Sequence, residues 1–499
     1  MEIKGGTAMV KGNVAYTLQD DDALEVDVAE SHLKFCSVTL SDVIARGKRL
    51  EASVFDVEAK QARAIVENGK YPVKMLGGSD GISSSYVRGR FKRIWLEESD
   101  LPIYQPSSIP DVYPEPDGYL SHKTKTNIDA LRVHSGQILM TCSGTIGKVS
   151  YVSKTLDNQI FSHDLLRINA RNVEDTGYIY AYLKSSIGNK ILLTNSYGAV
   201  ITHIEPEHLA TVPIPDAPLK IKKRINDLIV KSYKLRDESN CLIDDAKNLL
   251  QKELKLPDIR DIVAPLYKKN VDIDTFSVKL SDIEGRIDAS YHVPIAETIV
   301  SHMKKYAGEI TTISDKRVSK GIILAGVFKR TYVEEDYGYP FLGGKEITQL
   351  SPKTEKYLAR NVHRARYEKE LKVETNMILV TDRGTIGTVA FVPKHWNGWA
   401  VSQNVLKVIP ANDNIAGYLF VYLDSVWGHV LVKRQTYGSV VDMIDNHSLE
   451  AVEIPLLSNK AVQKKINDLA IEANQKRYNA YLLEEQALNI VDKEIIFAK

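Results

Sequence analysis

The sequence predicts an α+β protein with two tandem repeated α/β domains, each followed by a long helix. Three observations support this fold class: one long internal repeat, short β-type runs between turn residues, and leucines at seven-residue spacing near the end of each repeat unit. Two matched helices in one chain are expected to pair with each other as an antiparallel coiled coil.

The repeat is clearest where Gly144-Thr145-Ile146-Gly147 recurs as Gly384-Thr385-Ile386-Gly387, an offset of 240. The offset holds without a gap over 72 positions, of which 24 are identical, whereas random pairing of average compositions would give about 4. Downstream, Ile225-Asn226-Asp227-Leu228 matches Ile466-Asn467-Asp468-Leu469. The repeat therefore extends from about residue 38 to the end, and a unit of this size can bury its own core.

The repeat and its turn residues divide the chain into six expected segments. They are an extension outside the repeat (1–35), a first domain (36–217), a first spacer helix (218–257), a linker (258–277), a second domain (278–457) and a second spacer helix (458–499). Within the first domain, short runs of β-forming residues predict strands at 137–140, 148–152 and 164–168, and a helix is expected at about 178–193.

Heptad spacing in the two spacers predicts the residues that pair the helices. One seam position holds Leu228, Leu235, Leu242 and Leu249 in the first helix, and Leu469, Leu483 and Ile490 in the second. The other position holds mostly small residues, among them Ser232 and Ala246 in the first helix and Ala473 and Ala480 in the second. Leucine at one position and small side chains at the other are typical of helices that approach closely. The alternative is that each helix only covers its own domain.

Composition and motifs exclude several classes of protein. A chain that is 26% charged and 43% hydrophobic is ordinary for a globular protein, and no apolar run reaches the roughly 18 residues of a membrane span. The three cysteines are far apart and form neither a disulfide framework nor a zinc site, so a cytoplasmic location is expected. The net charge of +1 does not by itself indicate a nucleic-acid binder.

We find no motif that predicts catalysis. The chain contains no phosphate-binding loop, no dinucleotide fingerprint and no H-E-x-x-H zinc motif. Thr141-Cys142-Ser143-Gly144 could form a nucleophile turn, but its counterpart Thr381-Asp382-Arg383-Gly384 lacks both Cys and Ser. The sequence therefore predicts no catalytic residues, no metal site and no enzyme activity of its own.

An ordered set of motifs occurs twice and resembles the target recognition domain of the specificity subunits of type I restriction-modification systems. The set comprises T-x-x-G-T-I-G, then G-Y-x-x-x-Y-L-x-S, then Tyr-Gly (Tyr197-Gly198 and Tyr437-Gly438), then L-x-x-V-x-I-P before a long helix. The resemblance covers residues 38–499, and the first 35 residues depart from the pattern, so their role is not assigned.

The resemblance implies a DNA-reading function in phage defence. Each domain would read one half of a bipartite, asymmetric target in double-stranded DNA, and the helices would hold the halves at a fixed spacing. Two methyltransferase subunits would bind this core, and restriction–translocase subunits would join it. S-adenosylmethionine (AdoMet), Mg2+ and ATP would then belong to the partner subunits, and this chain would hold no cofactor.

Domains that read different half-sites should differ where they contact DNA. The first copy carries Ser83–Arg88 before Gly89, whereas the second carries only Ile323–Ala325 before Gly326. Arg suits bidentate contact with guanine and Lys is more often a phosphate contact, so basic and hydroxyl residues near these loops and turns are the candidates. They are Ser83, Ser84, Arg88, Arg90, Lys92, Arg93, Ser143, Thr145, Lys148, Lys329, Arg330, Arg360, Arg364, Arg383, Thr385, Lys433 and Arg434. Arg383 takes the place of Ser143 and is expected to contact a base.

Two alternative functions remain open at this point. The chain could be the specificity subunit of a related methyltransferase–nuclease system that is not type I. It could also be a bivalent protein-interaction scaffold with no DNA role. The sequence gives neither the target bases nor the gap between half-sites.

Overall fold

The computed structural model describes residues 7–10, 13–17, 37–45, 48, 50, 52–198, 202–259, 261, 275–283, 285–352, 356–438 and 441–498. The chain divides into two compact units. Unit 1 comprises Met1–Ile109, Glu115–Val230 and Glu484–Lys499, and unit 2 comprises Pro110–Pro114 and Lys231–Leu483. Both spacer helices cross from one unit to the other, so these units do not follow the predicted segment boundaries, which stay predictions. Most of the predicted linker 258–277 lies outside the described residues.

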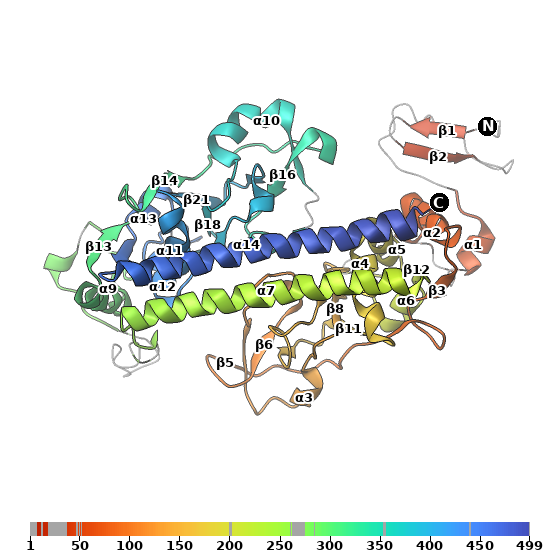
Figure 1. Cartoon of the computed structure of the whole chain (residues 1–499), viewed down its shortest axis with the longest axis horizontal. Helices are drawn as coiled ribbons and strands as arrows, with labels where there is room; N and C mark the ends of the chain where they lie inside the picture. Colours follow the sequence, from red (N-terminus) through yellow and green to blue (C-terminus); the bar gives the residue numbers. More distant parts are fainter. Residues whose placement is uncertain are drawn as a thin grey trace. The chain divides into compact units, whose positions relative to one another are not determined.

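Unit 1 holds the first copy of the repeat (Figure 1). Its main sheet is antiparallel, in the order β4 (Ser83–Tyr86), β11 (Leu165–Ala170), β8 (Ile138–Thr141), β9 (Val149–Tyr151). A smaller sheet has the order β10 (Ile160–Phe161), β6 (Pro102–Tyr104), β7 (Gly118–Leu120), β5 (Trp95–Leu96). The helices are α1 (Leu40–Ala45), α2 (Val57–Glu67), α3 (Ile128–Leu131), α4 (Thr176–Lys184), α5 (Ser186–Thr194) and α6 (Pro206–Ala210). Two further strand pairs are β3 (Val73–Met75) with β12 (Pro213–Pro215), and the hairpin β1 (Thr7–Val10) with β2 (Asn13–Thr17).

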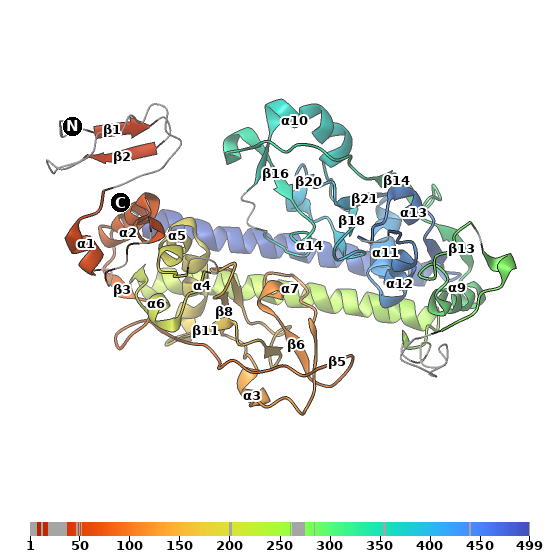
Figure 2. The same ribbon diagram turned by 180° about the vertical axis from the view of Figure 1, so that it is seen from behind.

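Unit 2 repeats this plan (Figure 2). The main sheet has the order β14 (Ser319–Ile323), β21 (Val405–Pro410), β18 (Ile378–Thr381), β19 (Val389–Phe391). The smaller sheet has the order β15 (Tyr332–Val333), β17 (Tyr357–Ala359), β16 (Gly338–Leu342), β20 (Ala400–Val401). The helices are α9 (Pro294–Tyr306), α10 (Arg360–Arg366), α11 (Asp413–Leu423), α12 (Val426–Arg434) and α13 (Asn446–Glu450), and β13 (Glu309–Thr312) pairs with β22 (Glu453–Leu456). The predicted fold class is confirmed.

The local predictions for the first domain hold with one change. The three expected strands are β8, β9 and β11. The expected helix is two helices, α4 and α5, because the chain breaks at Ser185. The Ser185 backbone is extended and its Oγ accepts a hydrogen bond from Gly188 N at 3.1 Å, so this residue caps the second helix.

The spacer helices are α7 (Leu219–Glu253) and α14 (Lys460–Ile490), the latter continuing as a π-helical turn at Val491–Ile496. Within unit 2, Ser232 Oγ on α7 donates to Ala480 O on α14 at 2.7 Å, and Glu238 pairs with Lys476 at 2.8 Å. Partners later in one helix are earlier in the other, so the two helices run antiparallel. In unit 1, the ion pair between Arg224 and Glu494 also joins an early residue of α7 to a residue near the end of the chain, which agrees with the antiparallel direction.

The seam between the helices differs in phase from the sequence prediction. The buried positions of α7 include the expected Ser232 and Ala246 together with Ile225 and Ser239. Those of α14 include the expected Ala473 and Ala480 together with Ile466 and Ala487. The second buried row, however, is Ile229, Arg236, Ile243 and Leu250 in α7, and Ala470, Arg477, Glu484 and Val491 at the end of the chain. The predicted leucines lie one residue earlier and are half-buried, while Ile490 is buried. Leu242, Leu249 and Leu469 pack against the core of the second domain, so these leucines attach the helices to a domain.

The repeated I-N-D-L and G-Y motifs join each domain to its own helix. Asn226 Oδ1 accepts a hydrogen bond from Gly177 N at 2.8 Å, and Asn467 Oδ1 accepts one from Gly417 N at 2.9 Å. A Cβ on Gly177 would lie 2.6 Å from the Asn226 Cα, so only glycine allows this approach. The next residue, Tyr178, donates from its hydroxyl to Pro215 O at 2.6 Å.

Each copy buries one cation at the same point of its main sheet. Arg167 on β11 donates to the carbonyl oxygens of Leu165, Leu131, Phe161 and Ser162 at 3.1–3.4 Å. Lys407 occupies the equivalent place on β21 and donates to the carbonyl oxygens of Glu370 and Lys372. Burial lowers the pKa of Arg167 to about 10 and that of Lys407 to about 8. Both cations tie the segments around the smaller sheet to the main sheet.

Among the described residues, no single helix is long and apolar enough to cross a membrane. The helices α11 and α12, which are bent against each other, would be long and apolar enough if taken together, but most of their apolar side chains lie in the core of the second domain.

Candidate nucleic-acid interface

The T-x-x-G-T-I-G motif forms the turn between two strands of the main sheet in both copies. Thr141 Oγ1 accepts a hydrogen bond from Lys148 N at 3.0 Å, and Thr381 Oγ1 accepts one from Thr388 N at 3.1 Å. The two glycines of each turn have positive φ, 70° and 81° in the first copy and 76° and 81° in the second, where other residues are strained. The motif is therefore framework, and the side chains it presents can vary.

The Tyr-Gly segments lie beside these turns. The residue before the first turn glycine, Ser143 or Arg383, forms a backbone bridge with His203 or Met443. The same partners bridge to Tyr197 and Tyr437. The structure thus brings two separate sequence motifs together at one edge of each domain.

In the first copy, five candidate DNA contacts are exposed: Ser84, Arg90, Lys92, Thr145 and Lys148. Arg88 is half-buried, with its guanidinium 4.6 Å from the centre of the Tyr86 ring. In the second copy, Lys329, Arg360, Arg364, Thr385 and Lys433 are exposed. One of these residues already makes a hydrogen bond within the protein, because Arg360 Nη1 donates to Asp336 O at 3.0 Å.

Arg93 and Arg330 are equivalent and half-buried, and both tie their segment to the strand region before β11 or β21. Arg93 Nη2 donates to Ser162 Oγ at 2.9 Å and lies 3.5 Å from Asp164. Arg330 Nη2 donates to Gln403 Oε1 at 2.8 Å. These arginines hold the candidate loops in place, and their neighbours Lys92 and Lys329 are exposed.

Two candidates are buried, which corrects the surface position expected for them. Ser83 is 2% exposed, and its Oγ donates to Leu76 O at 2.7 Å. Arg434 is 7% exposed and binds Glu297 at 2.5 Å and Glu453 at 3.3 Å. The carboxylates that neutralise Arg434 are distant in sequence, so its charge could not be recognised as internal.

Asp382 lies next to Arg383 and was not among the predicted site residues. Its side chain is 1% exposed, and Oδ2 accepts from Arg383 Nη2 at 2.8 Å and Nε at 3.0 Å. Burial raises the pKa of Asp382, while Arg383 acts in the opposite direction. In the first copy the equivalent residues are Cys142 and Ser143. Both positions therefore differ between the copies, and this joint difference was the signal in the sequence that could have indicated Asp382.

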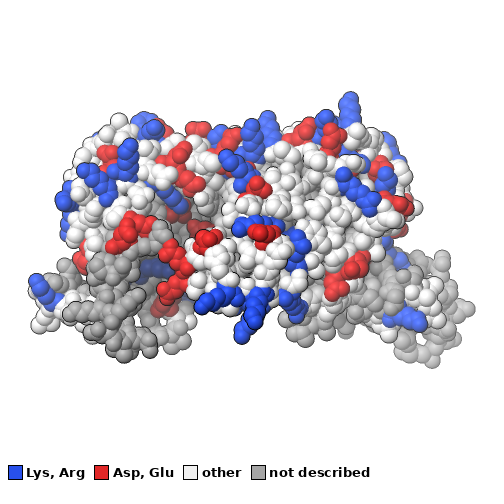
Figure 3. Space-filling view, turned by 90° about the horizontal axis from the view of Figure 1, so that it is seen from below, with Lys and Arg blue, Asp and Glu red and all other residues white. Residues whose placement is uncertain are grey.

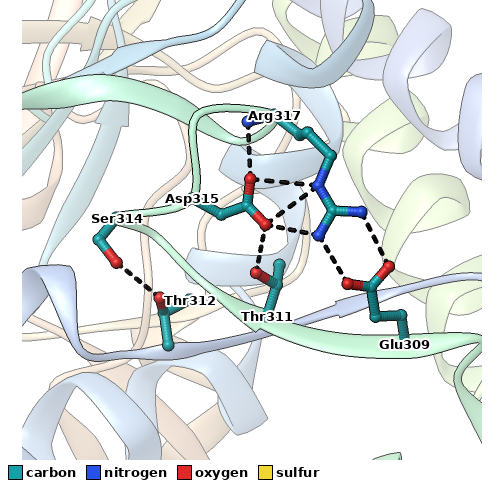
Figure 4. A network of polar contacts seen from close by, with 6 residues as sticks. All are labelled: Glu309, Thr311, Thr312, Ser314, Asp315 and Arg317. Atoms are coloured by element: carbon teal, nitrogen blue, oxygen red, sulfur yellow. Dashed lines mark hydrogen bonds and ion pairs between the residues drawn. The ribbon is translucent and has the colours of Figure 1, made fainter.

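Positive charge is not separated from negative charge on the face drawn in Figure 3. Figure 3 shows basic and acidic side chains interspersed over one face, with no continuous stripe of one sign. Some exposed arginines are also neutralised: Arg317 donates to both Glu309 and Asp315 within 3.2 Å (Figure 4). Its hydrogen bonds hold the pKa of Asp315 well below its usual range.

The cysteine of the first turn is not a reactive thiolate. Cys142 is buried, and desolvation raises its pKa to about 11, so the thiol remains protonated at neutral pH. Among the residues that the structure describes, no group of three or more His, Cys, Asp or Glu side chains could hold a metal ion.

Comparison with protein-family models identifies the class of protein. Residues 96–239 and 322–469 match the type I restriction modification DNA specificity domain. The two matches together cover more than half of the chain, so the chain belongs to this family and carries its domain twice.

Three solved structures are similar to this chain. A type-I restriction-modification S subunit from M. genitalium has 11% sequence identity and a TM-score of 0.34, covering 86% of this chain and 96% of that one. The HsdS subunit from Thermoanaerobacter tengcongensis has 14% identity and a TM-score of 0.26, covering 85% and 100%. A structure concerned with complex assembly and conformational transition of the type I R-M system has 15% identity and a TM-score of 0.26, covering 81% and 97%. No curated protein matches.

Proposed function

We propose that this chain reads a bipartite, asymmetric target in double-stranded DNA and directs methyltransferase and restriction–translocase subunits to it. Each copy of the domain reads one half-site. The observation that carries this proposal is that the two copies share their framework while their turns present different side chains, Ser143 in one and Arg383 in the other.

The paired helices suit the role of a spacer between half-sites. The 35 residues of α7 span about 50 Å at about 1.5 Å per residue, which exceeds one turn of B-DNA at roughly 34 Å. A rigid spacer makes the second half-site contact intramolecular, which raises affinity only for sites at the permitted distance. In this proposal AdoMet, Mg2+ and ATP are held by the partner subunits, and the complex works in the cytoplasm.

A domain exchange tests the proposal. The first domain, residues 36–217, is replaced by that of a relative, and methylated bases are mapped across the genome of cells carrying either chain and its methyltransferase. We expect one half of the methylated motif to change while the other half and the gap stay the same. The reciprocal exchange of residues 278–457 is the matched control and should change the other half. A change in both halves from one exchange would contradict the assignment of one half-site to each copy.

A further inference from the structure

The two turns of the repeat differ at two adjacent positions, one buried and one half-exposed. In the second copy the buried position is an aspartate, which is costly to bury unless it is paired. Asp382 is fixed from both sides by its backbone, which donates from N to Asn404 O at 3.2 Å and accepts from Ile444 N at 3.0 Å. The backbone of Asp382 is therefore held between two other segments of the domain, and its carboxylate lies in the interior.

The geometry of the pair leaves one edge of Arg383 available. Nε and one N–H of Nη2 point to Asp382 Oδ2, and the side chain is 37% exposed. Among the described residues no hydrogen bond is formed by Nη1. The outer edge of the guanidinium, formed by Nη1 and the second N–H of Nη2, is the edge that can donate two parallel hydrogen bonds to O6 and N7 of guanine.

The carboxylate also changes what Arg383 is suited to bind. A paired arginine contributes little net charge, which weakens long-range attraction to phosphate. Its orientation is restricted, however, so less side-chain entropy is lost when it forms directed hydrogen bonds. An arginine that is neutralised and oriented in this way favours contact with a base over contact with the DNA backbone.

Resting on the proposed function, we infer that Arg383 reads a guanine in the half-site of the second copy and that Asp382 is its positioning residue. The first copy, with Cys142 and Ser143 at the same turn, has no equivalent guanine contact. The inference therefore names both the base and the copy that reads it.

The test uses the chain assembled with its methyltransferase subunit and a duplex library randomised over both half-sites. The key variant replaces Asp382→Cys together with Arg383→Ser, which installs the residues that the first copy already accommodates at this turn. We expect the wild-type complex to prefer guanine at one position of one half-site by about ten- to hundred-fold, and the double variant to lose that preference. All other positions should be unchanged.

Two further variants separate reading from folding. Asp382→Asn keeps the shape and one acceptor, and should reduce the guanine preference several-fold while leaving the other positions unchanged. Arg317→Ala removes an exposed arginine that is also bound by carboxylates in unit 2, and should change no base preference. Because the Asp382–Arg383 pair carries no net charge, its removal should leave the salt dependence of binding unchanged, whereas loss of a phosphate contact would flatten the slope by about one.

The outcomes are distinguishable. Unchanged guanine preference in the double variant, or an equal loss of affinity for all sequences with a flatter salt slope, would overturn the inference while leaving the proposed function intact. A wild-type target without guanine in the second copy's half-site would overturn it as well. A wild-type complex that selects no bipartite sequence would contradict the proposed function itself, and the inference with it.

Discussion

The two copies attach to the spacer helices through equivalent positions but with opposite chemistry. In unit 1, Tyr180 and Lys184 on α4 both bind Glu484 of α14, whose side chain is completely buried. In unit 2, Phe420 takes the place of Tyr180, and Asp424, in the place of Lys184, binds Lys247 of α7 at 2.8 Å. The first attachment is a buried polar network and the second is an apolar contact with a half-exposed ion pair. A duplicated fold has thus kept its docking geometry while changing the interaction that provides it.

The buried network should be the most sensitive point of this comparison. Glu484→Leu removes the carboxylate that Lys184 and Tyr180 both bind, and breaking a buried pair in this way costs about 3 kcal/mol of stability. Denaturant unfolding of the purified chain measures the loss. In the second copy, Phe420 and Ile243 occupy the positions of Tyr180 and Glu484. Tyr180→Phe combined with Glu484→Ile installs these two residues and should recover most of the lost stability. A loss below about 0.5 kcal/mol in the single variant would show that the network contributes no more than a surface pair.

The buried cations give the next largest effect. Arg167→Met removes the donor to four carbonyl oxygens and should cost about 2–3 kcal/mol. Lys407→Met removes a donor to two carbonyls and should cost less, about 1–2 kcal/mol. Thermal unfolding of both variants beside the wild type checks the order. An equal cost would mean that the number of carbonyl partners does not determine the effect.

The same pair of cations predicts a difference at alkaline pH. Burial lowers the pKa of Lys407 to about 8 in the folded chain, below its value of 10.5 in the unfolded chain. Between these values the unfolded chain binds more protons, so the contribution of Lys407 to stability rises with pH, by about 1 kcal/mol from roughly pH 7 to 9. Lys407→Arg, which copies the first domain, stays charged and should lose this rise. Parallel pH–stability curves for wild type and Lys407→Arg would contradict the prediction.

The half-exposed pair should have the smallest effect. Asp424→Ala or Lys247→Ala removes an ion pair whose two side chains are 28% and 26% exposed, and we expect a cost of about 0.5–1 kcal/mol that falls at high salt. Asp424→Lys combined with Lys247→Asp should restore stability to near the wild-type value. Failure of this reversal, with each single variant costing several kcal/mol, would show that the two attachments are equally polar.

The repeat, the short β-forming runs and the heptad spacing together were enough to predict the fold class, the three strands of the first domain and the antiparallel helices. The phase of the helix seam was not predictable from the leucines, because the second buried row includes Arg236, Arg477 and Glu484. In a sequence, charged residues at such positions normally indicate a row that faces solvent. Only the tertiary contacts of these residues show that they are buried. The leucines one residue earlier are half-buried, and several of them pack on a domain core.

The sequence shows where the two copies differ but not which of those side chains are exposed. The G-T-I-G turns are flanked by different residues in the two copies, and the structure adds that the Tyr-Gly segments lie beside them. Ser83 and Arg434 were selected for their chemistry, but their backbone and carboxylate partners lie elsewhere in the chain. Asp382 was not predicted as a site residue, because aspartate is common in turns. Its burial beneath Arg383 depends on the fold and cannot be seen in the sequence.

The reversed ion pairs also determine which halves of such a chain can combine. If two first halves were to assemble, Lys184 would take the place of Asp424 and face Lys247 of the other half. If two second halves were to assemble, Asp424 would take the place of Lys184 and face Glu484. Both like-with-like combinations bring equal charges together at a docking point, whereas unlike halves pair opposite charges there. The reversed ion pairs therefore favour the combination of one first half with one second half, which is the asymmetric arrangement.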